Sequence, residues 1–175
     1  MFIFGHIGIT LGILTLLKQH PALSKMPTSL YVVAFGAMLP DLIDKPLGEV
    51  IFASSIGNGR IYGHTLLFCL LLLLTVIHLY KKRGDKRLLV IPAASFMHIM
   101  EDRLWMTPQT LFWPLLGWQF PDGHYSAGIL DYFLGIFRNA YTPALNYVFL
   151  SEIIGIIILF VAGIIHLKNV HKKVI

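Results

Sequence analysis

The chain has 175 residues, of which 56% are hydrophobic and only 13% are charged, and its mean hydropathy is +0.72. Soluble domains carry about 25% charged residues, so this composition excludes a protein whose surface lies mostly in water. The net charge of +5 is compatible with nucleic-acid binding. The basic residues, however, lie in short clusters beside long apolar runs, which is typical of membrane proteins among anionic lipids. We therefore expect the lipid bilayer as the partner, and no nucleic acid.

The length allows a single integral membrane domain, residues 1–175, of the all-α class. Apolar stretches predict about five membrane segments in a transmembrane helical bundle, at residues 2–17, 29–44, 63–80, 88–105 and 143–167. We expect the first to be a retained helix and not a signal peptide, because no basic region precedes it. The aromatic stretch 106–127 suits the membrane–water interface, and 129–140 could form an interfacial helix. The single cysteine, Cys69, excludes a disulfide framework.

The distribution of Lys and Arg predicts the orientation of the bundle. With the N-terminus outside, ten of the fourteen basic residues fall on the inner side: Lys18, Lys25, Lys81, Lys82, Arg83, Lys86, Arg87, Lys168, Lys172 and Lys173. Basic residues accumulate on the cytoplasmic side of membrane proteins. The sequence therefore predicts an N-out, C-in, multi-pass protein of the inner (plasma) membrane.

Ionisable residues recur in the outer halves of four predicted segments, where such groups are costly and rare. They are His6, Asp41, Asp44, His64, His98 and Asp102. The four-residue spacing of His98 and Asp102 puts both on one helix face, as does the three-residue spacing of Asp41 and Asp44 if the helix continues through Pro40. Imidazole and carboxylate ligands without thiolate suit zinc, manganese or iron. The pattern predicts a site for one or two divalent transition metal ions, with zinc favoured.

The remaining histidines fit this site less well. His20, His78, His166 and His171 lie at or beyond the inner ends of the segments, where we expect no ligand role. His124 lies on the outer side and could reach the site from its loop. Glu152 lies inside the last segment and needs a partner there, which could be a metal ion, Arg103 or Arg138.

The sequence resembles the YdjM-like (DUF457) family of membrane-bound metal-dependent hydrolases. The matching blocks lie between residues 5 and 114, about two-thirds of the chain, and in the order of the family. They are Gly5-His6, Leu39–Pro46, Arg60–Thr65, His98–Asp102, Thr107-Pro108 and Trp113-Pro114. The sequence departs from the family pattern at two points. Asp44 stands one residue later than the second aspartate of P-D-x-D, and Gly59 stands where a histidine often precedes the arginine.

The family is in turn distantly similar to zinc-dependent phospholipase C and P1 nuclease. That similarity implies that the metal ligands are His6, Asp41, His64, His98 and Asp102, holding two ions with Asp102 as the bridge. It also implies a reaction class, the hydrolysis of phosphoesters, and no particular substrate.

We therefore expect a membrane-embedded metal-dependent hydrolase that acts on a lipid-like or phosphorylated substrate at the outer face. Asp44 could orient a ligating imidazole or act as a general base. Arg60 and Arg103 are candidate phosphate ligands, because guanidinium binds phosphate bidentately. The alternative is a metal-binding transporter or channel, which would need polar groups through the inner halves of the segments. Those halves are apolar, and we expect Leu14, Leu71 and Ile157 to close the bundle beneath the site. A membrane protease is a weaker alternative, since no H-E-x-x-H motif occurs.

Overall fold

The computed structural model describes the chain except residues 54, 124–133, 136, 139, 144–145 and 175. The described residues form helices joined by turns and contain no β-strand, which confirms the all-α prediction. His124 and much of the predicted interfacial helix at 129–140 lie outside the described residues.

All five predicted segments form helices: α1 (Ile3–Leu17), α2 (Leu30–Pro46), α3 (Leu66–Arg83), α4 (Val90–Glu101) and α7 (Tyr147–Val174). Short helices connect them: η1 (Pro21–Leu23), η2 (Leu47–Ile51), η3 (Lys86–Leu89), η4 (Leu104–Met106) and α5 (Pro108–Leu111). The start of α3 lies three residues after the predicted one, because the Thr65 hydroxyl accepts a hydrogen bond from the Phe68 amide at 3.0 Å and caps the helix there. Helix α2 continues through Pro40, so the condition for pairing Asp41 with Asp44 on one face is met.

The helices differ in how far they could cross a bilayer, which takes about 20 apolar residues. Among the described residues, α7 is the one helix that is long and apolar enough, over Tyr147–Asn169. The other four predicted segments form helices of 12 to 18 residues. The helical elements are therefore confirmed, whereas five full crossings remain a prediction.

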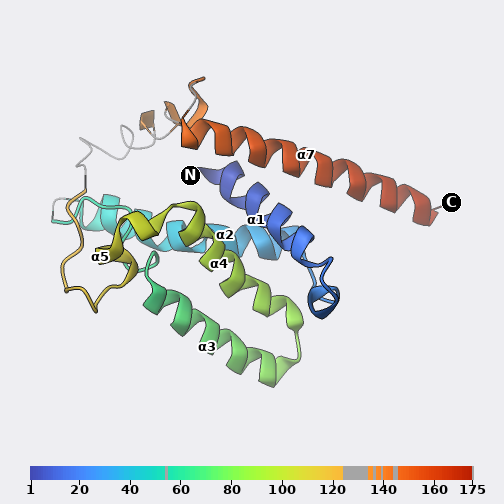
Figure 1. The fold of residues 1–175 in the computed structure, drawn as a ribbon, viewed down its shortest axis with the longest axis horizontal. Helices are drawn as coiled ribbons and strands as arrows, with labels where there is room; N and C mark the ends of the chain where they lie inside the picture. The colour runs from blue at the N-terminus through green and yellow to red at the C-terminus, as the bar shows by residue number, and fades with distance from the viewer. Residues whose placement is uncertain (54, 124–133, 136, 139, 144–145, 175) are drawn as a thin grey trace.

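The helices pack in a chain of neighbours (Figure 1): α7 lies along α1, α1 packs on α2, α2 on α4, and α4 on α3. Glycines let α1 and α7 approach most closely. A Cβ atom added to Gly8 would collide with the backbone of Gly155. Small residues at such a crossing allow close backbone packing, which stabilises helix pairs in membranes.

An apolar cluster lies toward the ends of α1, α2 and α4 that are opposite the predicted ligands. Leu11, Leu14, Val33 and Val90 form one buried cluster of α1, α2 and α4. The predicted packing of Leu71 and Ile157 beneath the site is wrong, because each side chain is 55% exposed. They lie on the outer faces of α3 and α7, where apolar side chains can contact lipid.

Candidate metal centre

One end of the bundle carries the predicted ligands, because helices starting there meet helices ending there. His6 lies near the start of α1, and His64 lies just before the Thr65 cap of α3. Asp41 lies near the end of α2, His98 lies in the last turn of α4, and Asp102 follows as its C-cap residue. All five side chains are buried, and each of the three histidines is fully inaccessible. Their ligand atoms form two groups, in each of which all atoms lie within 4.8 Å of one another.

The His64 group consists of Asp41, His64 and His98. Nε2 of His64 lies 3.1 Å from Nε2 of His98. Oδ1 of Asp41 lies 3.6 Å from the first of these nitrogens and 3.7 Å from the second. Tetrahedral zinc with ligand bonds of about 2.0–2.2 Å separates its ligand atoms by about 3.3–3.6 Å. The three atoms therefore have nearly the spacing of one face of a zinc coordination sphere.

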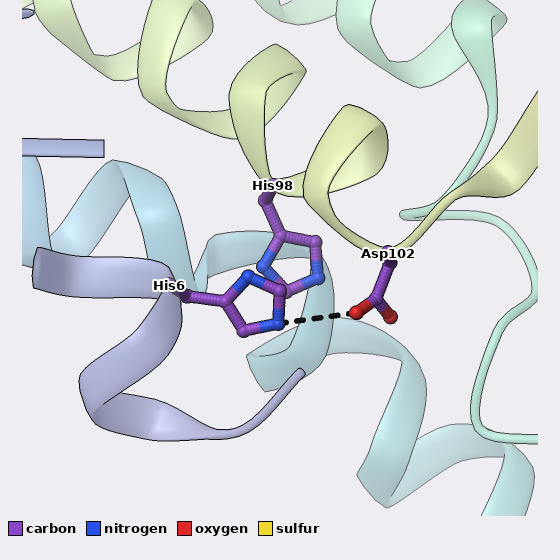
Figure 2. Close-up of side chains that lie close together, drawn as sticks. All are labelled: His6, His98 and Asp102. Atoms are coloured by element: carbon purple, nitrogen blue, oxygen red, sulfur yellow. Dashed lines mark ion pairs between the residues drawn. The ribbon is translucent and has the colours of Figure 1, made fainter. Parts of the chain in front are cut away.

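The His6 group consists of His6, His98 and Asp102 (Figure 2). Nε2 of His6 lies 3.3 Å from Oδ1 of Asp102. The rings of His6 and His98 are stacked, with centroids 3.8 Å apart. The other oxygen of Asp102, Oδ2, lies 3.8 Å from Nε2 of His64. The carboxylate of Asp102 thus faces both groups, one oxygen toward each.

Each histidine is oriented by a hydrogen bond at Nδ1. His98 Nδ1 lies 2.6 Å from the Ala37 carbonyl, which can only accept, so this nitrogen carries the proton. His64 Nδ1 donates to Oδ2 of Asp44 at 2.7 Å, and His6 Nδ1 donates to Oε2 of Glu101 at 2.9 Å. Metal-binding histidines almost always donate their second ring N–H to a carboxylate or carbonyl. In a neutral ring with a protonated Nδ1, Nε2 has a free lone pair, and all three Nε2 atoms face the centre.

These lone pairs test whether the residues fit a metal. Within the described part of the chain, His6 Nε2 is a buried side-chain atom that lacks any hydrogen-bond partner. It faces a carboxylate oxygen of Asp102, and the Nε2 atoms of His64 and His98 face each other. With Nδ1 protonated in each ring, all of these atoms are hydrogen-bond acceptors and none can donate to another. Unpaired buried polar atoms are costly. A divalent cation would bind these lone pairs and relieve their repulsion, so the donor set fits a metal.

Two ions would divide these ligands unequally. The Nε2 of His98 belongs to both groups, but one lone pair binds one ion. Its short distances to His64 and Asp41 favour the His64 group. Asp102 has two carboxylate oxygens and could contact ions in both groups. The predicted bridging role of Asp102 is compatible with this geometry and stays a prediction.

Asp44 lies beside the centre without pointing into it. Its side chain is fully buried, and it accepts hydrogen bonds from the backbone amides of Ile61, Gly63 and His64 at 2.7, 2.7 and 3.1 Å. It also accepts the Nδ1 proton of His64. With four donors around its two oxygens, Asp44 has the surroundings of an orienting residue, which is one of the two roles predicted for it.

The two predicted arginines lie at a pocket beside Asp102. A guanidinium nitrogen of Arg60 lies 2.8 Å from Oδ2 of Asp102, and the α-amino group of Met1 contacts Oδ1. The guanidinium of Arg103 lies 4.7 Å from the ring centroid of Tyr147, on its face. The pocket has a volume of about 250 Å³ and is lined by Met1, Arg60, Asp102, Arg103, Met106, Thr107, Tyr147 and Val148. Both arginines can thus reach a ligand held next to Asp102.

Two buried carboxylates have partners that the sequence did not predict. Glu101 orients His6 and also accepts a hydrogen bond from the Thr10 hydroxyl at 2.9 Å. Glu101 lies three residues after His98 and so shares its face of α4, a spacing signal that the ligand prediction left out. For Glu152 the predicted partner was a metal, Arg103 or Arg138. That prediction is wrong, because its carboxylate accepts from backbone amides of α1 and from a tyrosine hydroxyl.

In the part of the chain that the structure describes, the bundle has one helix long and apolar enough to span a bilayer and a buried His and Asp cluster at one end. These features define an α-helical membrane protein with a candidate metal centre. Residues 1–170 match the YdjM inner membrane protein family. The chain belongs to this family, which confirms the predicted resemblance and supports an inner membrane location. No curated protein and no solved structure matches it significantly. Similarity to phospholipase C and P1 nuclease therefore remains a prediction.

Proposed function

We propose that this protein is a membrane-embedded, metal-dependent hydrolase of phosphoesters. One observation carries the proposal: three buried imidazoles, each held at Nδ1, direct Nε2 toward two aspartates beside a pocket that contains two arginines. Divalent ions bound there would polarise a phosphoryl oxygen and make water a better nucleophile at neutral pH.

The protein's own residues would bind and orient the substrate. Arg60 and Arg103 carry permanent positive charge and can donate paired hydrogen bonds to phosphate oxygens. Thr107 adds a hydroxyl to the same pocket. Asp44, with all its oxygens engaged, keeps His64 in one tautomer and orientation and would not take a proton from water.

The substrate that we propose is lipid-like or phosphorylated and reaches the site from the outer leaflet. The rim of the pocket includes the apolar side chains of Met106 and Val148, and Met106 is 68% exposed. This proposal includes a multi-pass, N-out arrangement, in which the Lys81–Arg87 loop is cytoplasmic. Labelling of single cysteines introduced in that loop and at Arg60, from each side of the membrane, tests the arrangement.

The apolar cluster of the bundle favours hydrolysis over transport. Leu14, Val33 and Val90 each lie eight residues from a site residue of their own helix, which is about 12 Å along the axis. These buried side chains offer no polar group to a permeating ion. In this arrangement, buried apolar side chains close the inner side of the site.

The test is a phosphoesterase assay on purified protein in detergent and in lipid vesicles. We expect activity toward a phosphodiester or phospholipid that chelation abolishes and zinc or manganese restores. Arg103→Met should lower kcat/KM by about 10- to 100-fold, the size of a lost charged hydrogen bond. Arg83→Met at the far end of the bundle is the matched control and should leave activity unchanged. Metal-independent activity, or none on any phosphoester, would refute the proposal.

A further inference from the structure

Glu152 is a fully buried carboxylate in the second turn of α7 that the proposed chemistry does not use. Its Oε1 accepts from the amides of Phe2 at 3.1 Å and Gly5 at 2.8 Å. Its Oε2 accepts from the amide of Phe4 at 3.1 Å and from the hydroxyl of Tyr141 at 3.1 Å. None of the four donors belongs to α7.

These bonds replace a cap that α1 lacks. The N-cap residue of α1, Phe2, has no side-chain oxygen to accept a hydrogen bond from the first amides. Those amides have no partner inside the helix and carry the positive end of its dipole. A carboxylate from another helix therefore satisfies the first turn of α1 and is in turn stabilised by it, which explains a buried charge in an apolar helix.

The cap acts directly on a ligand residue. Gly5 precedes His6, and a Cβ on Gly5 would lie 2.7 Å from Oε1 of Glu152, so glycine is what lets the carboxylate approach. The rotation of this turn decides where the Cα–Cβ bond of His6 points. Only in a limited range of rotations can His6 donate to Glu101 while Nε2 faces Asp102.

We infer that Glu152 is a positioning residue that serves the His6 group and not the His64 group. The hydrogen bonds of Glu152 reach α1 and Tyr141, whereas His64 is held by Asp44, which also accepts from the backbone amides of Ile61 and Gly63. The inference rests on the metal site of the proposed function but does not depend on the reaction.

Zinc titration of the purified full-length protein in detergent, after chelation, tests the inference. His6→Ala and Asp41→Asn first define which binding event belongs to each group. Glu152→Gln turns an amide toward the α1 donors. It should therefore weaken the same zinc-binding event that His6→Ala removes. We expect zinc affinity at the His6 group to fall about 10- to 100-fold, as for other residues that orient ligands, with the His64 group unchanged.

Two further variants keep the test decisive if Glu152→Gln does not fold. Glu152→Asp retains the charge but is one methylene shorter, so it should weaken the same binding event by a smaller factor. Ser151→Ala is the matched control, because the Ser151 hydroxyl is buried but donates within α7, to Val148. It should bind zinc as the wild type does.

The outcomes separate this inference from the proposed reaction. Unchanged zinc affinity in the folded Glu152 variants, or an equal loss at both groups, would overturn the inference alone. Zinc binding with the expected pattern but no phosphoesterase activity would refute the reaction and support the inference. A wild-type protein that binds no transition metal would overturn both.

Discussion

The two ligand groups share His98 but are held in different ways. In the His64 group, one carboxylate, Asp44, binds a short stretch of backbone and the ring of His64 together. In the His6 group, the ligand is oriented by Glu101 on α4, 95 residues from His6, and by Glu152 on α7, 147 residues from the Gly5 amide that it binds. The first arrangement is a local clamp, and the second is a product of helix packing.

The difference shows where a metal site can be sensitive. A clamp around one carboxylate fails when that carboxylate changes, and it depends little on distant packing. A ligand held between packed helices responds to any change in their separation. Mutations that act on one arrangement and spare the other can therefore assign each ion.

The largest effect is expected for the shared ligand. His98→Ala removes the Nε2 that belongs to both groups and leaves the Ala37 carbonyl without its donor. We expect the protein to lose zinc from both groups, measured as metal content after gel filtration. His78→Ala, an exposed histidine at the far end of α3, should retain full metal content. Equal metal content in the two variants would contradict the placement of His98 at the centre.

A one-sided loss is expected for the local clamp. Asp44→Asn turns an amide N–H₂ toward backbone donors that are buried, so one or two of them lose their acceptor. The unfolding free energy should fall by about 2–3 kcal/mol, and zinc binding at the His64 group should weaken while the His6 group is spared. Denaturation in mixed micelles and zinc titration measure the two effects. Glu49→Gln, a half-buried carboxylate outside the site, serves as control.

A smaller effect should come from helix separation. Gly8→Ala places a methyl group against the backbone of Gly155, so α1 and α7 must move apart. Overpacking of this kind costs about 1–3 kcal/mol, and the shift should weaken zinc binding at the His6 group only. Gly163→Ala is the matched control on α7, since no atom lies within 4 Å of its added Cβ. That variant should be neutral or slightly stabilising. If both variants bind zinc equally well, helix separation does not control the His6 group.

The smallest effect lies at the opposite end of the bundle. Hydrogen bonds from Arg87 hold the pKa of Asp85 below its usual value. Because the folded-state pKa is depressed, the contribution of this pair to stability is present above the usual pKa of aspartate and is lost as the pH falls through the lowered pKa. Asp85→Asn should lower the melting temperature slightly at pH 7 and leave zinc binding unchanged. At a pH below the lowered pKa of Asp85, the variant and the wild type should melt at the same temperature. A change in zinc affinity would link the two ends.

Much of the centre could be predicted from sequence because ionisable side chains are rare in apolar helices. His6, His64 and Asp102 carry that signal by themselves, and the alternating direction of the helices brings their ends together. The helix boundaries were predicted within four residues, except that α7 continues to Val174 and not to residue 167. Thr65 and Gly84 explain where α3 starts and ends.

The residues that orient the ligands could not be predicted in the same way. Glu101 reaches His6 through the crossing of α1 and α4, and no spacing along either helix reports that crossing. For Glu152 the predicted partners were arginine side chains or a metal ion, whereas three of its four donors are backbone amides, which have no sequence signature. The predicted burial of Leu71 and Ile157 beneath the site failed for a related reason. Their helices are apolar on all sides, so the sequence does not show which face is buried.

The pairing of α1 with α7 has a consequence for biogenesis. The chain from α2 to α4, including the loop before α3, contains every residue of the His64 group and its clamp. This half can therefore assemble as soon as α4 has left the ribosome and entered the membrane. The His6 half needs Glu152, which is synthesised about 50 residues after Asp102. Contacts between distant parts of a chain form late. Until α7 arrives, α1 has an uncapped first turn, and a truncated chain that ends before Tyr147 would contain the ligands of both groups but lack the carboxylate that caps α1 at the His6 group.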